Sequence, residues 1–206
     1  MVLSCSYRYV FSGISGNGLH QFNYPVDIVR IPSSGTLYIT DVFNHRIMRY
    51  LFNASSGTVV AGGNGPGSNT NQLNNPFCFA FDSSSNSFLI ANYDAHTIVR
   101  WVLGATNWTL VAGVVGSPGS TSTLLRSPLS ITLDFMKNMY VADSDNHRIQ
   151  LFLAGQSNAS TIAGVTGSAG NASNQFNQPY WVILDAQLNL LVADTFNHRV
   201  LRFQRS

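Results

Sequence analysis

The feature that most constrains the fold of this chain is an internal repeat with a period of 51 residues. The stretch DSDNHRIQLF has three relatives, DVFNHRIMRY, NYDAHTIVRW and DTFNHRVLRF, and consecutive copies start 51 residues apart, at Asp41, Asn92, Asp143 and Asp194. Prolines precede the copies at nearly the same interval, at Pro25, Pro76, Pro128 and Pro179. Repetition at such a period indicates stacked supersecondary units.

Each repeat contains four short apolar runs separated by turn-forming residues. In the third repeat these runs are 129–133, MYVA, HRIQLF and STIAG. No window shows a sustained period of 3.6 residues, so helices are not expected. Four strands in a unit of about 40–50 residues are typical of a propeller blade. We therefore predict an all-β fold, a single-domain β-propeller of four four-stranded blades; the blades comprise 14–62, 63–113, 114–164, and 165–206 together with 7–13.

The pattern D-x-x-N-H-R-[IV], placed after an apolar strand, resembles the NHL repeat, and the resemblance extends from about Tyr7 to Phe203. The second repeat departs from the pattern, with Asn92, Ala95 and Thr97 in place of Asp, Asn and Arg. The resemblance implies a β-propeller, and members of the NHL family most often have six blades. Four repeats leave two arrangements open, a closed ring of four blades or an open arc from a larger propeller.

The two ends of the repeat pattern complement each other. Tyr7–Gly13 reads as a fourth strand without the three strands before it, and the last repeat has no fourth strand after Phe203. We expect the amino-terminal strand to pair antiparallel with Val200–Phe203 and to complete the last blade, which would remove two free sheet edges. In an open arc, those edges would instead be available for self-association.

Composition restricts the class of partner. Charged residues make up 10% of the chain, the net charge is +2, and Lys137 is the only lysine. Proteins that bind nucleic acid usually carry a basic stripe, so the composition disfavours such a partner. No apolar run reaches the ~20 residues of a spanning helix, so no membrane insertion is expected.

Sequons and cysteines say little about the compartment. The N-x-[ST] sequons would make the protein a glycoprotein if it is secreted, but their number is what chance gives for a chain so rich in Asn, Ser and Thr. They stand at Asn53, Asn107, Asn158 and Asn171. Cys5 precedes an expected outer strand and Cys78 lies on an expected inner strand, so no disulfide is predicted between them.

The acid, histidine and arginine of the repeated motif could form either a site or a scaffold. The four histidines would lie on the third strands of different blades, too far apart to share a zinc ion, and a catalytic site copied in every blade is not expected. The second repeat loses its Asp and its Arg together, which favours an ion pair that clamps the turn. The predicted pairs are Asp41–Arg46, Asp143–Arg148 and Asp194–Arg199. Replacing Asp143 by alanine should destabilise the fold by about 1–4 kcal/mol.

Candidate binding residues are those at which the repeats differ. Two residues after the prolines stand Asp27, Cys78, Ser130 and Trp181, near the expected mouth of the channel. The NHL pattern usually has a small residue there, so Asp27 and Trp181 suggest a pocket mouth with an acid and an aromatic; variable packing around a narrow tunnel is the alternative. Phe43, Tyr93 and Phe196 stand on turns of the same face, where they either contact a partner or pack on the next blade.

These features predict a non-enzymatic interaction module that presents one loop face to a protein or peptide, with no cofactor and no metal. RNA binding, known in several NHL proteins, is one alternative, but it needs basic loops with stacking aromatics, and these loops are almost free of Lys and Arg. An enzyme is the other, because the amidating lyases have a similar propeller with an axial metal. Asp27 is the only plausible metal ligand on the expected inner strands.

Overall fold

The computed structural model describes residues 13–204, which form fifteen strands and four 3-10 turns of three residues each. The first two blades contain β1 (Pro25–Arg30), β2 (Leu37–Asp41), β3 (Arg46–Tyr50), β4 (Thr58–Gly62), β5 (Pro76–Asp82), β6 (Ser87–Asn92), β7 (Thr97–Val102) and β8 (Thr109–Gly113). The last two contain β9 (Pro128–Leu133), β10 (Met139–Asp143), β11 (Arg148–Phe152), β12 (Ala159–Gly164), β13 (Pro179–Leu184), β14 (Leu190–Asp194) and β15 (Arg199–Phe203). The turns are η1 (Val42–Asn44), η2 (Tyr93–Ala95), η3 (Ser144–Asn146) and η4 (Thr195–Asn197).

The strands form four antiparallel sheets, and each sheet is one repeat. Blades 1, 2 and 3 have four strands in sequence order, and blade 4 has three, β13, β14 and β15. Each sheet begins at one of the repeated prolines, where the missing N–H is tolerated because a strand end needs no further ladder bond. The all-β prediction and the four blades are confirmed. No helix of the described residues is long and apolar enough to cross a membrane.

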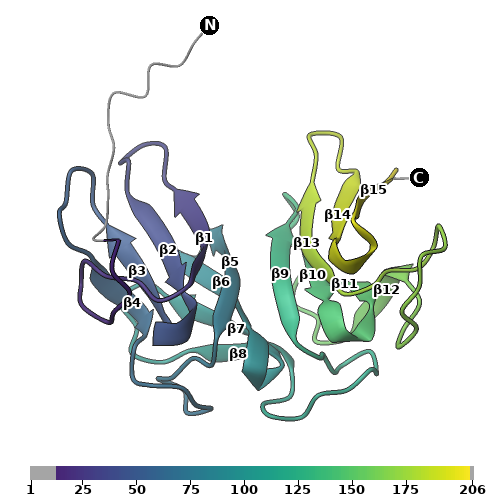
Figure 1. Ribbon diagram of the computed structural model, residues 1–206, viewed down its shortest axis with the longest axis horizontal. Coiled ribbons are helices and arrows are strands. Elements are labelled where there is room, and N and C mark those ends of the chain that lie inside the picture. Colours follow the sequence, from purple (N-terminus) through teal and green to yellow (C-terminus); the bar gives the residue numbers. More distant parts are fainter. Residues whose placement is uncertain (1–12, 205–206) are drawn as a thin grey trace, which may run out of the picture.

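The four blades follow one another along an arc, with the inner strands β1, β5, β9 and β13 toward its axis (Figure 1). Consecutive blades are joined by separate apolar cores. Ile47 of blade 1 packs with Phe79 of blade 2, and Ile149 of blade 3 packs with Val182 of blade 4. Most of the core of the described residues therefore lies in three joints between blades, as expected for a repeat structure, and a smaller cluster of Ile39, Met48 and Tyr50 lies within blade 1.

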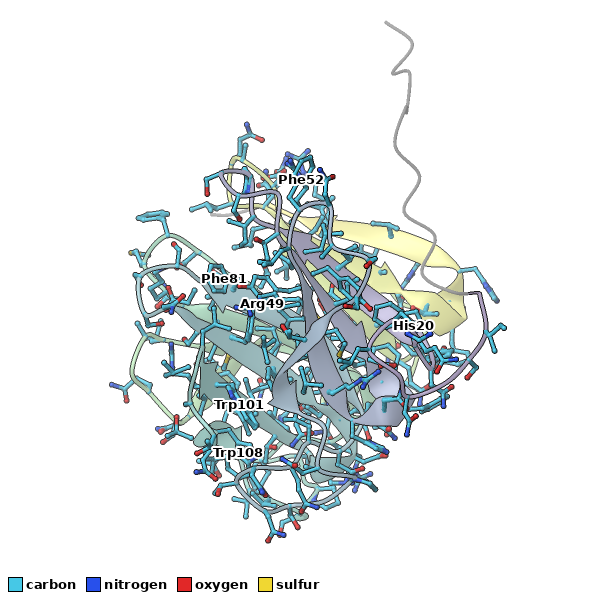
Figure 2. The ribbon with its side chains drawn as sticks, turned by 90° about the vertical axis from the view of Figure 1, so that its left-hand side faces the viewer. His20, Arg49, Phe52, Phe81, Trp101 and Trp108 are labelled. Carbon is cyan, nitrogen blue, oxygen red and sulfur yellow. The ribbon has the colours of Figure 1, made fainter. Side chains whose placement is uncertain are left out.

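The joint between blades 1 and 2 is the most aromatic. Tyr38 lies against Phe81 and Phe88, with ring centroids 5.9 and 4.9 Å away. Trp101 and Trp108 lie close together toward the outer part of blade 2 (Figure 2), and both belong to the same buried cluster. These two indoles donate to backbone carbonyls, which satisfies their polar atoms inside an apolar core.

A charged contact supports the joint between blades 2 and 3. The single lysine, Lys137, places its Nζ 2.8 Å from an Asp82 carboxylate oxygen, and Arg100 approaches the other oxygen at 3.4 Å. Burial opposes ionisation of Asp82, but hydrogen bonds from Lys137, Ser84 and Ser85 outweigh it and hold the pKa of that carboxyl well below its usual range.

The two ends of the arc stay apart. β1 and β13 lie at opposite ends of the row of blades in Figure 1, so the described residues form an open arc and not a closed ring of four. The predicted closing strand, Tyr7–Gly13, lies outside the described residues except for Gly13. Within residues 13–204, β15 pairs only with β14, and its outer edge carries no further strand.

Candidate functional site: a repeated clamp and an aromatic turn face

The repeated motif forms a buried clamp between the 3-10 turn of a blade and the loop that precedes the blade. In blade 3, Asp143 Oδ2 accepts hydrogen bonds from Arg148 Nε and Asn146 Nδ2, each at 2.8 Å. Its Oδ1 accepts the backbone N–H of Arg126 at 2.7 Å. The remaining guanidinium nitrogens donate to loop carbonyls, those of Ser120, Thr121 and Leu124, at 2.7–3.1 Å. The arginine is thus saturated by the protein itself.

The same clamp recurs in blades 1 and 4. Asp41–Arg46 and Asp194–Arg199 have Nε–Oδ2 distances of 2.7 Å, so all three predicted ion pairs are present within their own blades. The carboxylates are fully buried in every copy, but the arginine side chains are 6%, 3% and 26% exposed in blades 1, 3 and 4. Burial raises the pKa of Asp143, and its hydrogen bonds to Arg126, Asn146 and Arg148 offset part of that rise.

Blade 2 shows what remains when the ion pair is lost. Asn92 still accepts the Asn74 N–H through Oδ1, at 2.6 Å, so the bond to the loop is kept. Asn92 Nδ2 and Thr97 Oγ1 are buried without a hydrogen-bond partner, although the two residues are directly paired between β6 and β7. The joint replacement seen in the sequence therefore removes both charges and leaves two polar atoms unsatisfied, which favours a structural role for the pair.

The histidines of the motif connect one blade to the next. Asn75, Ser127 and Gln178 donate their backbone N–H groups to Nδ1 of His45, His96 and His147, at 3.1–3.2 Å. Each donor stands directly before the proline that opens the following blade. Burial lowers the pKa of His45 and of His96, which favours the neutral imidazole that this bond requires. His45, His96 and His147 therefore connect consecutive blades by a side-chain to backbone hydrogen bond.

The left-handed backbone of the turn falls on the histidines, with φ between 53° and 58°, although asparagine adopts this conformation more readily. Asn146 instead ends η3, and its side-chain amide bridges Asp143 and the Gly119 carbonyl. The left-handed histidine lets the chain reverse into the third strand while its ring reaches the next blade.

The position two residues after the proline also contacts the next blade. Asp27 accepts the Phe79 N–H at 3.0 Å, and Ser130 accepts the Val182 N–H at 3.2 Å. Burial raises the pKa of Asp27, and the bond from Phe79 partly offsets that rise. Asp27 is therefore held in a joint, and it also lines a hollow of about 520 Å³ together with Ile28 and Ile39. Trp181, on β13, does not belong to the lining of that hollow.

Two features of the described residues bear on metal ligation and thiol chemistry. Within residues 13–204, no three potential ligands among His, Cys, Asp and Glu come together. Cys78 is buried and free, and burial raises the pKa of its thiol well above the ordinary value. Cys5 lies outside the described residues, so the predicted absence of a Cys5–Cys78 disulfide stays a prediction.

Aromatic side chains gather on the turn face, which we define as the face carrying η1–η4 and the loops that precede the blades. Tyr24 stacks on Phe43 with centroids 4.9 Å apart, and Phe77 lies 5.9 Å from Tyr93. Together with Tyr180, these four line a hollow of about 210 Å³. Phe196 joins the group through Tyr180, 5.9 Å away. Phe43 and Phe196 are each 50% exposed.

The turn face thus unites residues that the sequence singled out with others that it did not. Phe43, Tyr93 and Phe196 were candidates, and Tyr24, Phe77 and Tyr180 were not. The missed residues all stand next to a repeated proline, one before Pro25 and two directly after Pro76 and Pro179. An aromatic beside the proline in three of four repeats was the signal that could have found them.

Comparison with known proteins agrees with the resemblance seen in the repeat. No family model matches the chain. Its sequence is 39% identical over 84 residues to NHL repeat-containing protein 2 of Bos taurus, and 38% identical to the Homo sapiens protein. The structure builds a sheet around each D-x-x-N-H-R motif, with four strands in blades 1 and 3 and three described strands in blade 4. The repeats of this chain are therefore similar to NHL repeats in both sequence and structure. The aligned region spans 37% of the chain but 11% of the bovine protein.

The NHL-repeat arc also resembles longer propellers among solved structures. It matches an auxiliary nutrient binding protein from Bacteroides thetaiotaomicron with a TM-score of 0.63 and 21% identity, covering 83% of the chain and 45% of that protein. A streptogramin B lyase gives a TM-score of 0.62 at 13% identity, covering 88% and 51% of the two chains. At such identities the likeness shows the fold alone. The arc spans about half of these solved chains.

Proposed function

We propose that this NHL-repeat chain is a non-enzymatic interaction module that binds a protein or peptide segment through its turn face. The observation that carries the proposal is the aromatic hollow, which is lined by residues of all four blades. Partly exposed aromatic side chains provide contact area at low entropic cost and are enriched among interface hot spots.

The chemistry of the hollow favours an apolar side chain of the partner. Its volume of about 210 Å³ suits one side chain or a short segment and not a large cofactor. The surrounding rings offer apolar surface, and burial raises the pKa of Tyr93, so its hydroxyl stays protonated and able to donate near neutral pH. A partner segment with an aromatic or branched aliphatic residue is therefore the expected ligand.

The polar clusters support a binding role over a catalytic one. The clamp arginines are occupied by carboxylates and loop carbonyls, which leaves them little capacity for RNA phosphates. The acidic candidate Asp27 is engaged by the next blade. The likeness to a streptogramin B lyase is a likeness of fold, so it assigns no activity to this chain.

Selection from a displayed random-peptide library with the purified chain would test the proposal. Selected peptides should bind Phe43→Ser and Phe196→Ser variants at least ~10-fold more weakly than the unchanged protein, because hot-spot aromatics commonly contribute more than 1 kcal/mol. Phe135→Ser is the matched control, since Phe135 is 72% exposed and stands on the β9–β10 turn, at the opposite end of the strands from the turn face. Its affinity should change less than about twofold.

Three results would contradict the proposal. The first is that selected peptides bind the Phe43 and Phe196 variants as tightly as the unchanged protein. The second is that no peptide is enriched. A retarded complex with single-stranded RNA at moderate salt, lost on substitution of the turn-face aromatics, would replace protein binding by RNA binding.

A further inference from the structure

The three joints between blades use equivalent residues on each side. One side contributes the isoleucine after the clamp arginine or its threonine equivalent, which is fully buried at Ile47, Ile98 and Ile149. The other side contributes the residue three positions after the proline, which is at most 5% exposed at Phe79, Ile131 and Val182. The joint is therefore a repeated interface with two distinct and complementary halves.

At each end of the arc, equivalent positions of one half are exposed, although Ile39, Met48 and Tyr50 of blade 1 are buried against Phe22 and Leu37. At the end formed by blade 1, Ile28 is equivalent to Phe79, Ile131 and Val182 but is 59% exposed. At the end formed by blade 4, Val200 is equivalent to the buried isoleucines but is 68% exposed, and Ile183 is also exposed. We call these surfaces the blade-1 end face and the blade-4 end face. Exposed apolar surface of this kind usually marks an interface.

The polar part of the joint is divided between the ends in the same way. At each joint a histidine Nδ1 accepts the N–H of the residue before the next proline. The corresponding donor on blade 1 is Tyr24, whose φ of 62° resembles the 49–51° of Asn75, Ser127 and Gln178. The corresponding acceptor on blade 4 is His198, which is exposed. Among the described residues, neither the Tyr24 N–H nor His198 makes this bond. The donor therefore lies at one end of the arc and the acceptor at the other.

We propose that the blade-4 end face of one copy packs on the blade-1 end face of a second copy, forming a fourth joint of the same type between chains. The occupant is a second copy because this chain carries both halves of an interface that it already forms three times. Such a contact is heterologous, so copies would join head to tail into a closed ring or a short open chain. The turn faces of the joined copies would then lie on one side.

Sedimentation velocity over a concentration series tests the association. The unchanged chain should form dimers or larger species as concentration rises. Ile28→Glu and Val200→Glu should each weaken association by more than about 100-fold, because the joint would bury a carboxylate without a partner. Both positions are exposed in the single arc, so the thermal unfolding midpoint of dilute protein should not change. Phe135→Glu, an exposed apolar site on a middle blade, is the control and should associate normally.

Mixing the two variants gives the decisive result. The Ile28→Glu chain keeps its blade-4 end face and the Val200→Glu chain keeps its blade-1 end face, so an equimolar mixture should form a 1:1 dimer that neither variant forms alone. Failure of the mixture to dimerise would overturn the proposal, as would a Val200→Glu chain that associates normally. A monomeric unchanged chain at high concentration would also overturn it, and would indicate that another segment covers the end faces.

Discussion

The clamp of blade 3 gives the sharpest test of the structural account. Asp143→Ala removes an acceptor of three hydrogen bonds of 2.7–2.8 Å, from Arg126, Asn146 and Arg148. The arginine side chain is 3% exposed, so its charge cannot turn to water without opening the loop. Breaking such a buried pair from one side commonly costs about 3–5 kcal/mol, and we expect a loss of that size in the free energy of unfolding.

The equivalent change in blade 4 should cost less. Asp194→Ala removes the same contacts, but Arg199 is 26% exposed and can be partly hydrated once its partner is gone. We expect a loss of about 1–3 kcal/mol. Urea unfolding followed by circular dichroism measures both values by linear extrapolation, and unchanged m-values would show that the transitions are comparable.

Blade 2 supplies a control for the same clamp. The double variant Asp143→Asn/Arg148→Thr copies the pair found at Asn92 and Thr97, where neither charge is present. It should be less destabilised than the sum of its two single variants, because neither charge is left alone. The reasoning is refuted if Asp143→Ala costs less than about 1 kcal/mol, if Asp194→Ala costs as much, or if the double variant is additive.

Three further predictions follow from the joints. Asn92→Asp alone should lower the free energy of unfolding by about 2 kcal/mol or more, and adding Thr97→Arg should recover part of it; equal stability of the two variants in urea would contradict the clamp. Burial lowers the pKa of His45 and His96 below 6.5, so the stability that their neutral rings contribute is complete above pH 6.5 and is lost as pH falls through the lower folded values. The double variant His45→Asn/His96→Asn should therefore show a smaller change of the free energy of unfolding with pH between about pH 7 and 5. An unchanged pH dependence would refute this role. In a Cys5→Ser variant, Cys78 should react with a thiol reagent only on unfolding, and rapid labelling of the native variant would disprove its burial.

Much of the fold could be predicted because the same pattern of apolar runs, prolines and motif residues occurs in each repeat. The strand bounds, the four sheets and the ion pairs all follow from alternation, prolines and the paired loss of Asp and Arg in blade 2. The arrangement of blades did not follow, since local sequence sets each blade while curvature depends on how side chains fill the joints. Four blades could close or stay open, and only the exposure of Ile28 and Val200 distinguishes the two for the described residues.

The site was harder to predict than the scaffold. No role of their own was predicted for the histidines, yet His96 persists in blade 2 where the clamp charges are gone, and that persistence was a sign of a separate role. Asp27 was predicted at a pocket mouth because it departs from the pattern. Its carboxylate takes the place of the Ser130 hydroxyl as an acceptor between blades, and it also lines a hollow of about 520 Å³. The aromatic hollow is lined by residues of all four blades, so no single repeat reveals it.

The central claim is that the chemistry-bearing motif is scaffold and that recognition belongs to the aromatic turn face. The direct test measures peptide Kd and the urea midpoint together for Arg148→Lys and Phe43→Ser. The account predicts that Arg148→Lys lowers the midpoint and leaves Kd within about twofold, because lysine cannot hold the carboxylate and the loop carbonyls together. Phe43→Ser should leave the midpoint nearly unchanged and weaken binding at least ~10-fold. A folded Arg148→Lys protein that no longer binds the peptide, beside a Phe43→Ser protein that binds normally, would contradict it.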